Sequence, residues 1–179
     1  MVLEPNTYSV RARHMVYILF GVSGSGKTTI GKLLSKIIQK PFIDADDYHT
    51  SENILKMENM ISLTDKDREV WLIALNKLIA KWNKEGGAIL ACSALKEQYR
   101  SMLAEGNNVS FIFLEGNQEL ISKRIATRKG HFFPIKLLQN QYDILEIPTY
   151  GIRVEVDRSP EDVCKEIYTA IKVDNAKDN

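Results

Sequence analysis

Short apolar runs rich in β-branched and aromatic residues alternate along this chain with longer segments in which apolar residues recur every three or four positions. The short runs predict strands, and their continuous hydrophobicity is typical of strands covered on both faces. The longer segments predict amphipathic helices. We therefore expect an α/β fold of three layers, in which helices cover both faces of a five-stranded parallel sheet. The predicted strands are Val16–Phe20, Phe42–Asp44, Ala88–Cys92, Ser110–Leu114 and Ile152–Val156.

Two helix starts are marked by capping residues. Thr64 with Asp67 three positions later resembles a capping box, and Ser159 before Pro160 opens the last helix. The length of 179 residues is usual for one domain. We assign a single domain to residues 15–172, a flexible N-terminal extension to residues 1–14 and a flexible tail to residues 173–179.

Composition and charge exclude several classes of function. Hydrophobic residues make up 44% of the chain and charged residues 26%, and the formal net charge of +1 gives no general attraction for nucleic acid or an acidic membrane. No apolar run is long enough for a membrane span. Cys92 and Cys164 form no CxxC pair, which favours reduced thiols and a cytoplasmic location. The sequence is compatible with a homodimer but does not determine the oligomeric state.

The segment after the first predicted strand, residues 21–28, matches the P-loop pattern G-x-x-x-x-G-K-[ST] in full. Glycines in such a loop let successive backbone N–H groups point at phosphate oxygens, and the following helix adds the positive end of its dipole. We predict ATP binding, with Lys27 bridging the β- and γ-phosphates and the Thr28 hydroxyl in the Mg²⁺ shell. The predicted nucleotide-binding residues are Gly21, Val22, Ser23, Gly24, Ser25, Gly26, Lys27, Thr28 and Thr29.

Other nucleotide-binding loops fit the sequence less well. A dinucleotide-binding loop would need a third glycine at the position of Thr29. A guanine-reading N-K-x-D motif is missing, because Asn76-Lys77 and Asn83-Lys84 are followed by Leu-Ile and Glu-Gly. The loop is therefore assigned to an ATP-type nucleotide.

An acidic cluster follows the second predicted strand, at the sheet edge where ligands of open α/β folds bind. Asp44 and Asp46 are two residues apart, so that one can face Mg²⁺ while the other faces the acceptor of the phosphoryl group. Asp46 is our candidate base, because an Asp can orient an attacking hydroxyl and take its proton. His49 is either an acceptor ligand or a packed loop histidine. The alternative for the acidic residues is that they only cap the next helix.

Several further motifs make the chain resemble the P-loop gluconokinase family. The resemblance runs from Met15 to about Lys172, and the segments Cys92-Ser93-Ala94-Leu95-Lys96 and Lys129-Gly130-His131-Phe132 make it specific. It implies ATP- and Mg²⁺-dependent phosphorylation of D-gluconate at the 6-hydroxyl, giving 6-phosphogluconate. A sugar acid also needs cationic ligands for its carboxylate. The predicted substrate-binding residues are Asp46, His49, Arg68, Ser93, Lys96, Arg100 and His131, although Lys96 and Arg100 could instead lie on a solvated helix face.

The resemblance also implies a mobile lid. Arg124 and Arg128 lie four residues apart on a helical pattern and can face one way. By resemblance Arg124 stacks on adenine and Arg128 is a catalytic residue that neutralises the transferring phosphoryl group. Gly130 would supply the hinge and His131 part of the cover. The alternative is a solvated helix face.

Three other functions remain in competition with gluconate phosphorylation. Shikimate kinases and nucleoside monophosphate kinases share the P-loop, the acidic strand end and an arginine lid, but a shikimate kinase would show a glycine run in place of Cys92–Lys96. A non-catalytic nucleotide-binding module needs only Lys27 and Thr28, so the presence of Asp46 and Arg128 as well argues against it.

Overall fold

The computed structural model describes residues 14–127 and 135–177. Its five strands form one parallel sheet in the order β2-β3-β1-β4-β5. The predicted α/β class is confirmed, and the strands lie within one residue of their predicted ends. Their bounds are β1 Val16–Phe20, β2 Phe42–Asp44, β3 Ala88–Ala91, β4 Val109–Glu115 and β5 Ile152–Glu155.

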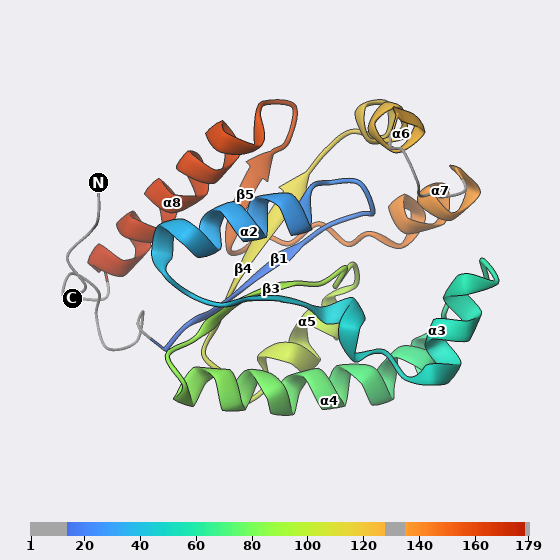
Figure 1. The fold of residues 1–179 in the computed structure, drawn as a ribbon, viewed down its shortest axis with the longest axis horizontal. Helices are drawn as coiled ribbons and strands as arrows, with labels where there is room; N and C mark the ends of the chain where they lie inside the picture. The colour runs from blue at the N-terminus through green and yellow to red at the C-terminus, as the bar shows by residue number, and fades with distance from the viewer. Residues whose placement is uncertain (1–13, 128–134, 178–179) are drawn as a thin grey trace.

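Helices cover both faces of the sheet, as the continuous hydrophobicity of the strands predicts. Figure 1 shows α2 and α8 over one face and α4 and α5 over the other. The remaining helices, α3, α6 and α7, lie near the end of the sheet where the strands finish (Figure 1). The helix bounds are α2 Lys27–Ile38, α3 Ser51–Glu58, α4 Asp65–Lys84, α5 Glu97–Ala104, α6 Gln118–Thr127, α7 Ile135–Ile144 and α8 Pro160–Lys177, with a 3₁₀ turn η1 at Ala45–Tyr48.

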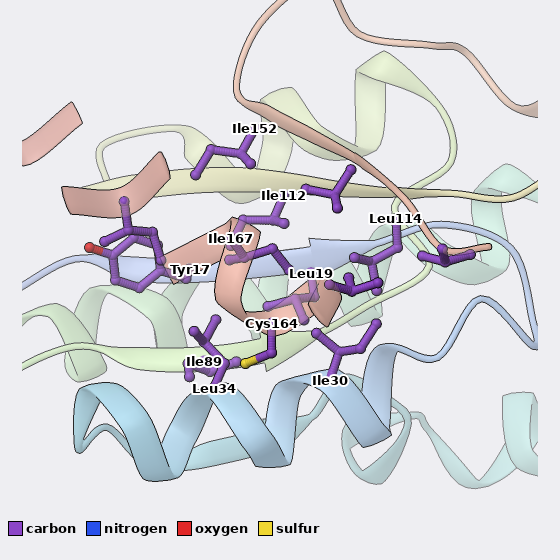
Figure 2. Close-up of a cluster of buried hydrophobic side chains, with 14 of the residues drawn as sticks. Tyr17, Leu19, Ile30, Leu34, Ile89, Ile112, Leu114, Ile152, Cys164 and Ile167 are labelled. Carbon is purple, nitrogen blue, oxygen red and sulfur yellow. The ribbon is translucent and has the colours of Figure 1, made fainter. Parts of the chain in front are cut away.

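The core consists of two apolar clusters, one on each face of the sheet. Alternate side chains of β1 enter different clusters: Leu19 packs with α2 and α8, whereas Ile18 and Phe20 pack with α4 and α5. Figure 2 shows Ile30 and Leu34 of α2 on the same side of the sheet as Cys164 and Ile167 of α8. The sheet is therefore a central layer between two helical layers. This arrangement leaves the carboxyl ends of the strands as the place where loops can form a site.

Local signals in the sequence account for the helix starts. Thr64 and Asp67 form the predicted capping box at α4, and the Ser159 hydroxyl accepts the Asp162 N–H at the start of α8. The predicted tail is partly wrong, because α8 continues to Lys177 and Asn175 on it is buried. The helix therefore runs beyond Ile171, where the apolar pattern ends, and the Asn175 side chain lies beside Tyr17 of β1.

The N-terminal extension lies outside the described residues, except for His14. The His14 carbonyl accepts from the side-chain amide of Asn83, near the end of α4. Among the described residues, no helix has the length and hydrophobicity needed to cross a membrane.

Candidate active site

The P-loop joins the end of β1 to the start of α2, as the sequence predicts. Gly26 is the N-cap of α2 and has a left-handed φ of 97°, which is unfavourable for residues with a Cβ atom. Gly24 has a φ of 82°, and a Cβ atom there would lie only 2.9 Å from the Ile125 side chain of α6. The loop is therefore held close against α6. The side chains of Thr28 and Thr29 at the start of α2 are exposed.

Lys27 lies under the P-loop rather than in solvent. Its Nζ donates to the carbonyl oxygens of Gly21 at 2.9 Å and Val22 at 3.0 Å. Burial lowers the pKa of Lys27, while the negative charges of Asp46 and Asp44 oppose that shift. The ammonium group is thus placed between the backbone of the loop and the acidic end of β2.

Asp44 connects the P-loop to the acidic cluster. Its Oδ2 accepts from the Thr28 hydroxyl at 3.2 Å, and its Oδ1 accepts from the Asp46 N–H at 3.2 Å. A hydroxyl and a carboxylate oxygen are the hard donors that Mg²⁺ prefers when it takes its other ligands from phosphates and water. The pair formed by Thr28 and Asp44 therefore fits a Mg²⁺ ion bound with a nucleotide. No group of three potential metal-binding side chains occurs among the described residues.

Asp46 lies on η1, immediately beyond the strand. Its side chain is 73% exposed and is accessible to an acceptor. Partial desolvation by the surrounding loops raises the pKa of Asp46, the charge of Asp44 raises it further, and Lys27 opposes the shift. A carboxylate with a raised pKa accepts a proton more readily than an ordinary Asp. The position and the electrostatics therefore suit a group that receives a hydroxyl proton.

His49 is held between an aromatic ring and two polar side chains. Its ring stacks on Trp71 of α4, with centroids 4.1 Å apart and an interplanar angle of 17°. Its Nε2 lies 3.7 Å from Asp46 Oδ1. Burial, together with the charge of Arg68, lowers the pKa of His49 to about 4, so that the ring is neutral at pH 7.

The contacts of Asn53 favour one tautomer of His49. Asn53 Nδ2 donates to the Asp67 carbonyl at 2.8 Å, which fixes the amide orientation because a carbonyl can only accept. The same Nδ2 lies 3.5 Å from His49 Nδ1. In this arrangement Nδ1 accepts and Nε2 carries the proton toward Asp46. Asn53 is buried, and sequence reasoning gave it no role in the site.

Arg68 and Lys96 both lie close to the Tyr99 ring. The Arg68 guanidinium is 5.6 Å from the ring centroid and the Lys96 ammonium 5.7 Å. Lys96 also forms an ion pair of 2.9 Å with Asp65, and the Tyr99 hydroxyl donates to the same carboxylate. Arg68 donates to the carbonyl oxygens of residues 63 and 64, and among the described residues it contacts no carboxylate. Arg68 is therefore the less neutralised of the two cations.

Ser93 follows β3 and lies beside the P-loop. Its carbonyl accepts the Gly21 N–H at 3.2 Å. The structure thus places Ser93 at the same edge of the sheet as the P-loop, where the sequence predicts substrate.

The predicted substrate contact of Arg100 is wrong. Arg100 is fully buried, and all five of its N–H donors are used. Its partners are the carbonyl oxygens of Ala94, Leu95 and Glu146, the Glu97 carboxylate and the Tyr150 hydroxyl. The side chain joins the start of α5 to the segment after α7. The alternative of a solvated helix face is also wrong, because the tertiary fold covers the residue completely.

Only part of the predicted lid falls within the described residues. Arg124 on α6 is half-buried, and its guanidinium donates to the Val156 carbonyl just after β5. Arg128, Gly130 and His131 lie outside the described residues, so that the predicted lid stays a prediction. Gln141 on α7 contacts Ser23 of the P-loop with its side-chain amide, although no motif in the sequence indicated it.

Known proteins are similar in sequence to this chain over most of its length. A protein described as a probable gluconokinase from Dictyostelium discoideum is 36% identical over 177 residues, covering 90% of this chain and 88% of its own length. The thermoresistant gluconokinase of Escherichia coli is 39% identical over 165 residues, covering 89% of this chain and 94% of its own. The chain belongs to the gluconokinase family. This result confirms the resemblance inferred from the sequence motifs.

Solved structures agree with this gluconokinase assignment. A gluconokinase from Sinorhizobium meliloti 1021 superposes with a TM-score of 0.83 at 34% identity, covering 92% of this chain and 95% of that one. A family model described as shikimate kinase matches residues 23–146. The shikimate kinase of Aquifex aeolicus, at 22% identity and a TM-score of 0.58, shares the fold. The chain is therefore a kinase built on the P-loop fold that these enzymes have in common.

Proposed function

We propose that this gluconokinase-family enzyme transfers the γ-phosphoryl group of ATP to the 6-hydroxyl of D-gluconate, giving 6-phosphogluconate. One observation in the structure carries the proposal. The P-loop lysine and an exposed carboxylate with a raised pKa, Asp46, lie together at the edge of the sheet where ligands of α/β folds bind. The names of the gluconokinase relatives supply the identity of the acceptor.

The nucleotide side of the reaction uses groups that stabilise negative charge. The P-loop amides and Lys27 would bind the β- and γ-phosphates, and Thr28 with Asp44 would hold Mg²⁺. A Mg²⁺ ion held there would supply positive charge to offset the negative charge that develops during transfer. The Lys27 ammonium has three N–H donors, of which the carbonyl oxygens of Gly21 and Val22 accept two, so that another can bind a phosphate oxygen. Arg124 and Arg128 complete the nucleotide side in this proposal, stacking on adenine and neutralising the phosphoryl group.

The acceptor side orients one hydroxyl group. Asp46 accepts the hydrogen bond of the 6-hydroxyl and takes its proton as the oxygen attacks phosphorus in line with the leaving group. The neutral His49 directs its Nε2 proton toward Asp46 and helps to hold that carboxylate. In this proposal His49 and His131 also form hydrogen bonds with hydroxyl groups of the substrate.

The carboxylate of gluconate requires a cation at the far end of the same site. We assign this role to Arg68, with Lys96 and Ser93 as further ligands. Arg68 is half-buried beside Tyr99 and retains N–H donors beyond those used by the carbonyl oxygens of residues 63 and 64. A guanidinium group can bind a carboxylate through two parallel hydrogen bonds.

A panel of acceptors tests this function. The purified chain is incubated with Mg·ATP and, separately, with gluconate, shikimate or a nucleoside monophosphate, and ADP release is measured. Of the three acceptors, we expect only gluconate to stimulate ADP formation. NMR of the product should show the phosphate on the 6-oxygen. Stimulation by shikimate or a nucleoside monophosphate instead would assign the chain to another kinase class. ADP release that gluconate does not change would refute the proposal.

The cellular location and the oligomeric state of the enzyme are also proposals. Cys92 and Cys164 are buried free thiols, which supports a reducing cytoplasmic location. A homodimer is supported by large apolar side chains that are exposed on α4, Val70 and Ile73. Light scattering during gel filtration would distinguish a mass of about twice the 20.4 kDa chain from that of a monomer.

A further inference from the structure

Gln141 of α7 contacts the P-loop with both polar atoms of its side chain. Its Oε1 accepts the backbone N–H of Ser23 at 2.6 Å, and its Nε2 donates to the Ser23 hydroxyl at 3.1 Å. Both contacts are partly buried and join residues 118 positions apart in the sequence. We propose that Gln141 is a positioning residue for phosphoryl transfer, which holds Lys27 in place through one peptide group of the P-loop.

The peptide between Val22 and Ser23 transmits this effect. A trans peptide group is planar, and its N–H and C=O point in opposite directions. Because the Ser23 N–H is bonded to Gln141, the Val22 carbonyl is directed to the other side. There it accepts from Lys27 Nζ at 3.0 Å and from the Ser25 N–H at 3.2 Å. Rotation of this one peptide group would therefore disturb the contact to Gln141 and both contacts inside the loop.

The helix that carries Gln141 is itself firmly held. Leu138 on α7 is fully buried, and the Tyr142 hydroxyl donates to the Gly116 carbonyl at 2.8 Å. Just beyond α7, the Glu146 N–H donates to the Leu95 carbonyl at 2.9 Å. Figure 1 shows α7 and α6 next to the end of the P-loop. Gln141 thus extends from a fixed frame, as a residue that positions another group must.

The contacts of Gln141 lie on the nucleotide side of the site. Its direct partner is Ser23, whereas Asp46 and Arg68 belong to η1 and α4 on the acceptor side. If Gln141 only stabilised the fold, its loss would lower the melting temperature without changing turnover well below that temperature. If it positions Lys27, its loss must change kcat and the affinity for ATP while the KM for gluconate stays the same.

The test compares Gln141→Met with Gln139→Met. Methionine preserves the length of glutamine but provides no comparable hydrogen bonds. Gln139 is exposed on the same helix and bonds to Gln118 and Asp143, so that the same substitution there is a matched control. The measurements are kcat, the KM values of Mg·ATP and gluconate at 20 °C, the Kd of Mg·ATP by calorimetry, and the melting temperature. Two lost hydrogen bonds of ordinary strength predict that kcat/KM for ATP falls roughly tenfold in Gln141→Met.

A second variant separates the loss of hydrogen bonds from general damage. Gln141→Glu keeps an acceptor for the Ser23 N–H but adds a negative charge beside the phosphate-binding loop. At saturating Mg·ATP its kcat should remain closer to that of the unmodified chain than the kcat of Gln141→Met. Equal kcat values in Gln141→Met and Gln139→Met would overturn the proposal, as would equal losses in Gln141→Glu and Gln141→Met. The inference rests on the proposed reaction, but failure of the unmodified chain to phosphorylate gluconate would be seen separately. The Kd of ATP would still test Gln141 in that case.

Discussion

Replacement of Arg100 by methionine should destabilise the enzyme rather than weaken substrate binding. The guanidinium group is fully buried and donates to the carbonyl oxygens of Ala94, Leu95 and Glu146, and its central carbon lies 5.0 Å from the centroid of the Phe20 ring. Each hydrogen bond from a charged donor is worth about 1.5–3 kcal/mol, and the acceptors would lose their partner inside the protein.

The net effect is smaller than the sum, because a buried cation also costs desolvation energy that methionine avoids. We therefore expect Arg100→Met to lower the free energy of unfolding by about 3–5 kcal/mol. For a chain of this size such a loss lowers the melting temperature by roughly 6–20 °C. Urea unfolding monitored by tryptophan fluorescence and circular dichroism measures the difference.

The matched control is Arg153→Met. Arg153 forms a close ion pair with Glu115, but its side chain is 55% exposed, and exposed ion pairs contribute little to stability. An Arg100→Met variant that unfolds at the same urea concentration as the control, and that shows a raised KM for gluconate, would refute the structural role. That result would instead favour the prediction from the sequence that Arg100 contacts the substrate.

Three further outcomes are expected. Asp46→Asn should lower kcat by more than a hundredfold while changing the KM for gluconate little, as general base catalysis typically contributes about 10²–10⁴-fold; a near-normal kcat would remove Asp46 from the role of base. Arg68→Ala should raise the KM for gluconate roughly tenfold or more through loss of a charge-assisted contact, with the KM for ATP unchanged. Asp67 should stabilise the fold at neutral pH, because its contacts with Lys56 and Thr64 hold its pKa at about 2. This stabilisation is complete above the unfolded pKa of 3.8 and disappears as the pH falls toward 2, so that Asp67→Asn should differ from the unmodified chain in melting temperature at pH 7 but not near pH 2.

Local patterns in the sequence were sufficient to predict the parts of the site whose residues are neighbours along the chain. The P-loop lies between β1 and α2 as predicted, because its glycines, its lysine and the helix start are contiguous. The capping box of Thr64 and Asp67 spans only three residues, and it was also predictable. The contact between Thr28 and Asp44 follows from two motifs that each end at the same edge of the sheet.

The tertiary structure alone decided the roles of long polar side chains. The sequence places Arg68, Lys96 and Arg100 near strand ends or helix starts. Only packing shows that Arg100 is buried, while Arg68 bonds to no carboxylate in the described part of the chain. A long flexible side chain can reach many partners, so that its position in the sequence does not determine its partner.

The sequence by itself determined the fold class, the phosphate-binding loop, the acidic strand end and the family, because each depends on residues close together in the chain. The contacts that join Gln141 to Ser23, His49 to Trp71 and Arg100 to Glu146 were decided only by the fold. The physical reason is that such contacts form between elements whose distance in space is set by the packing of the whole sheet. That distance cannot be inferred from a short sequence pattern.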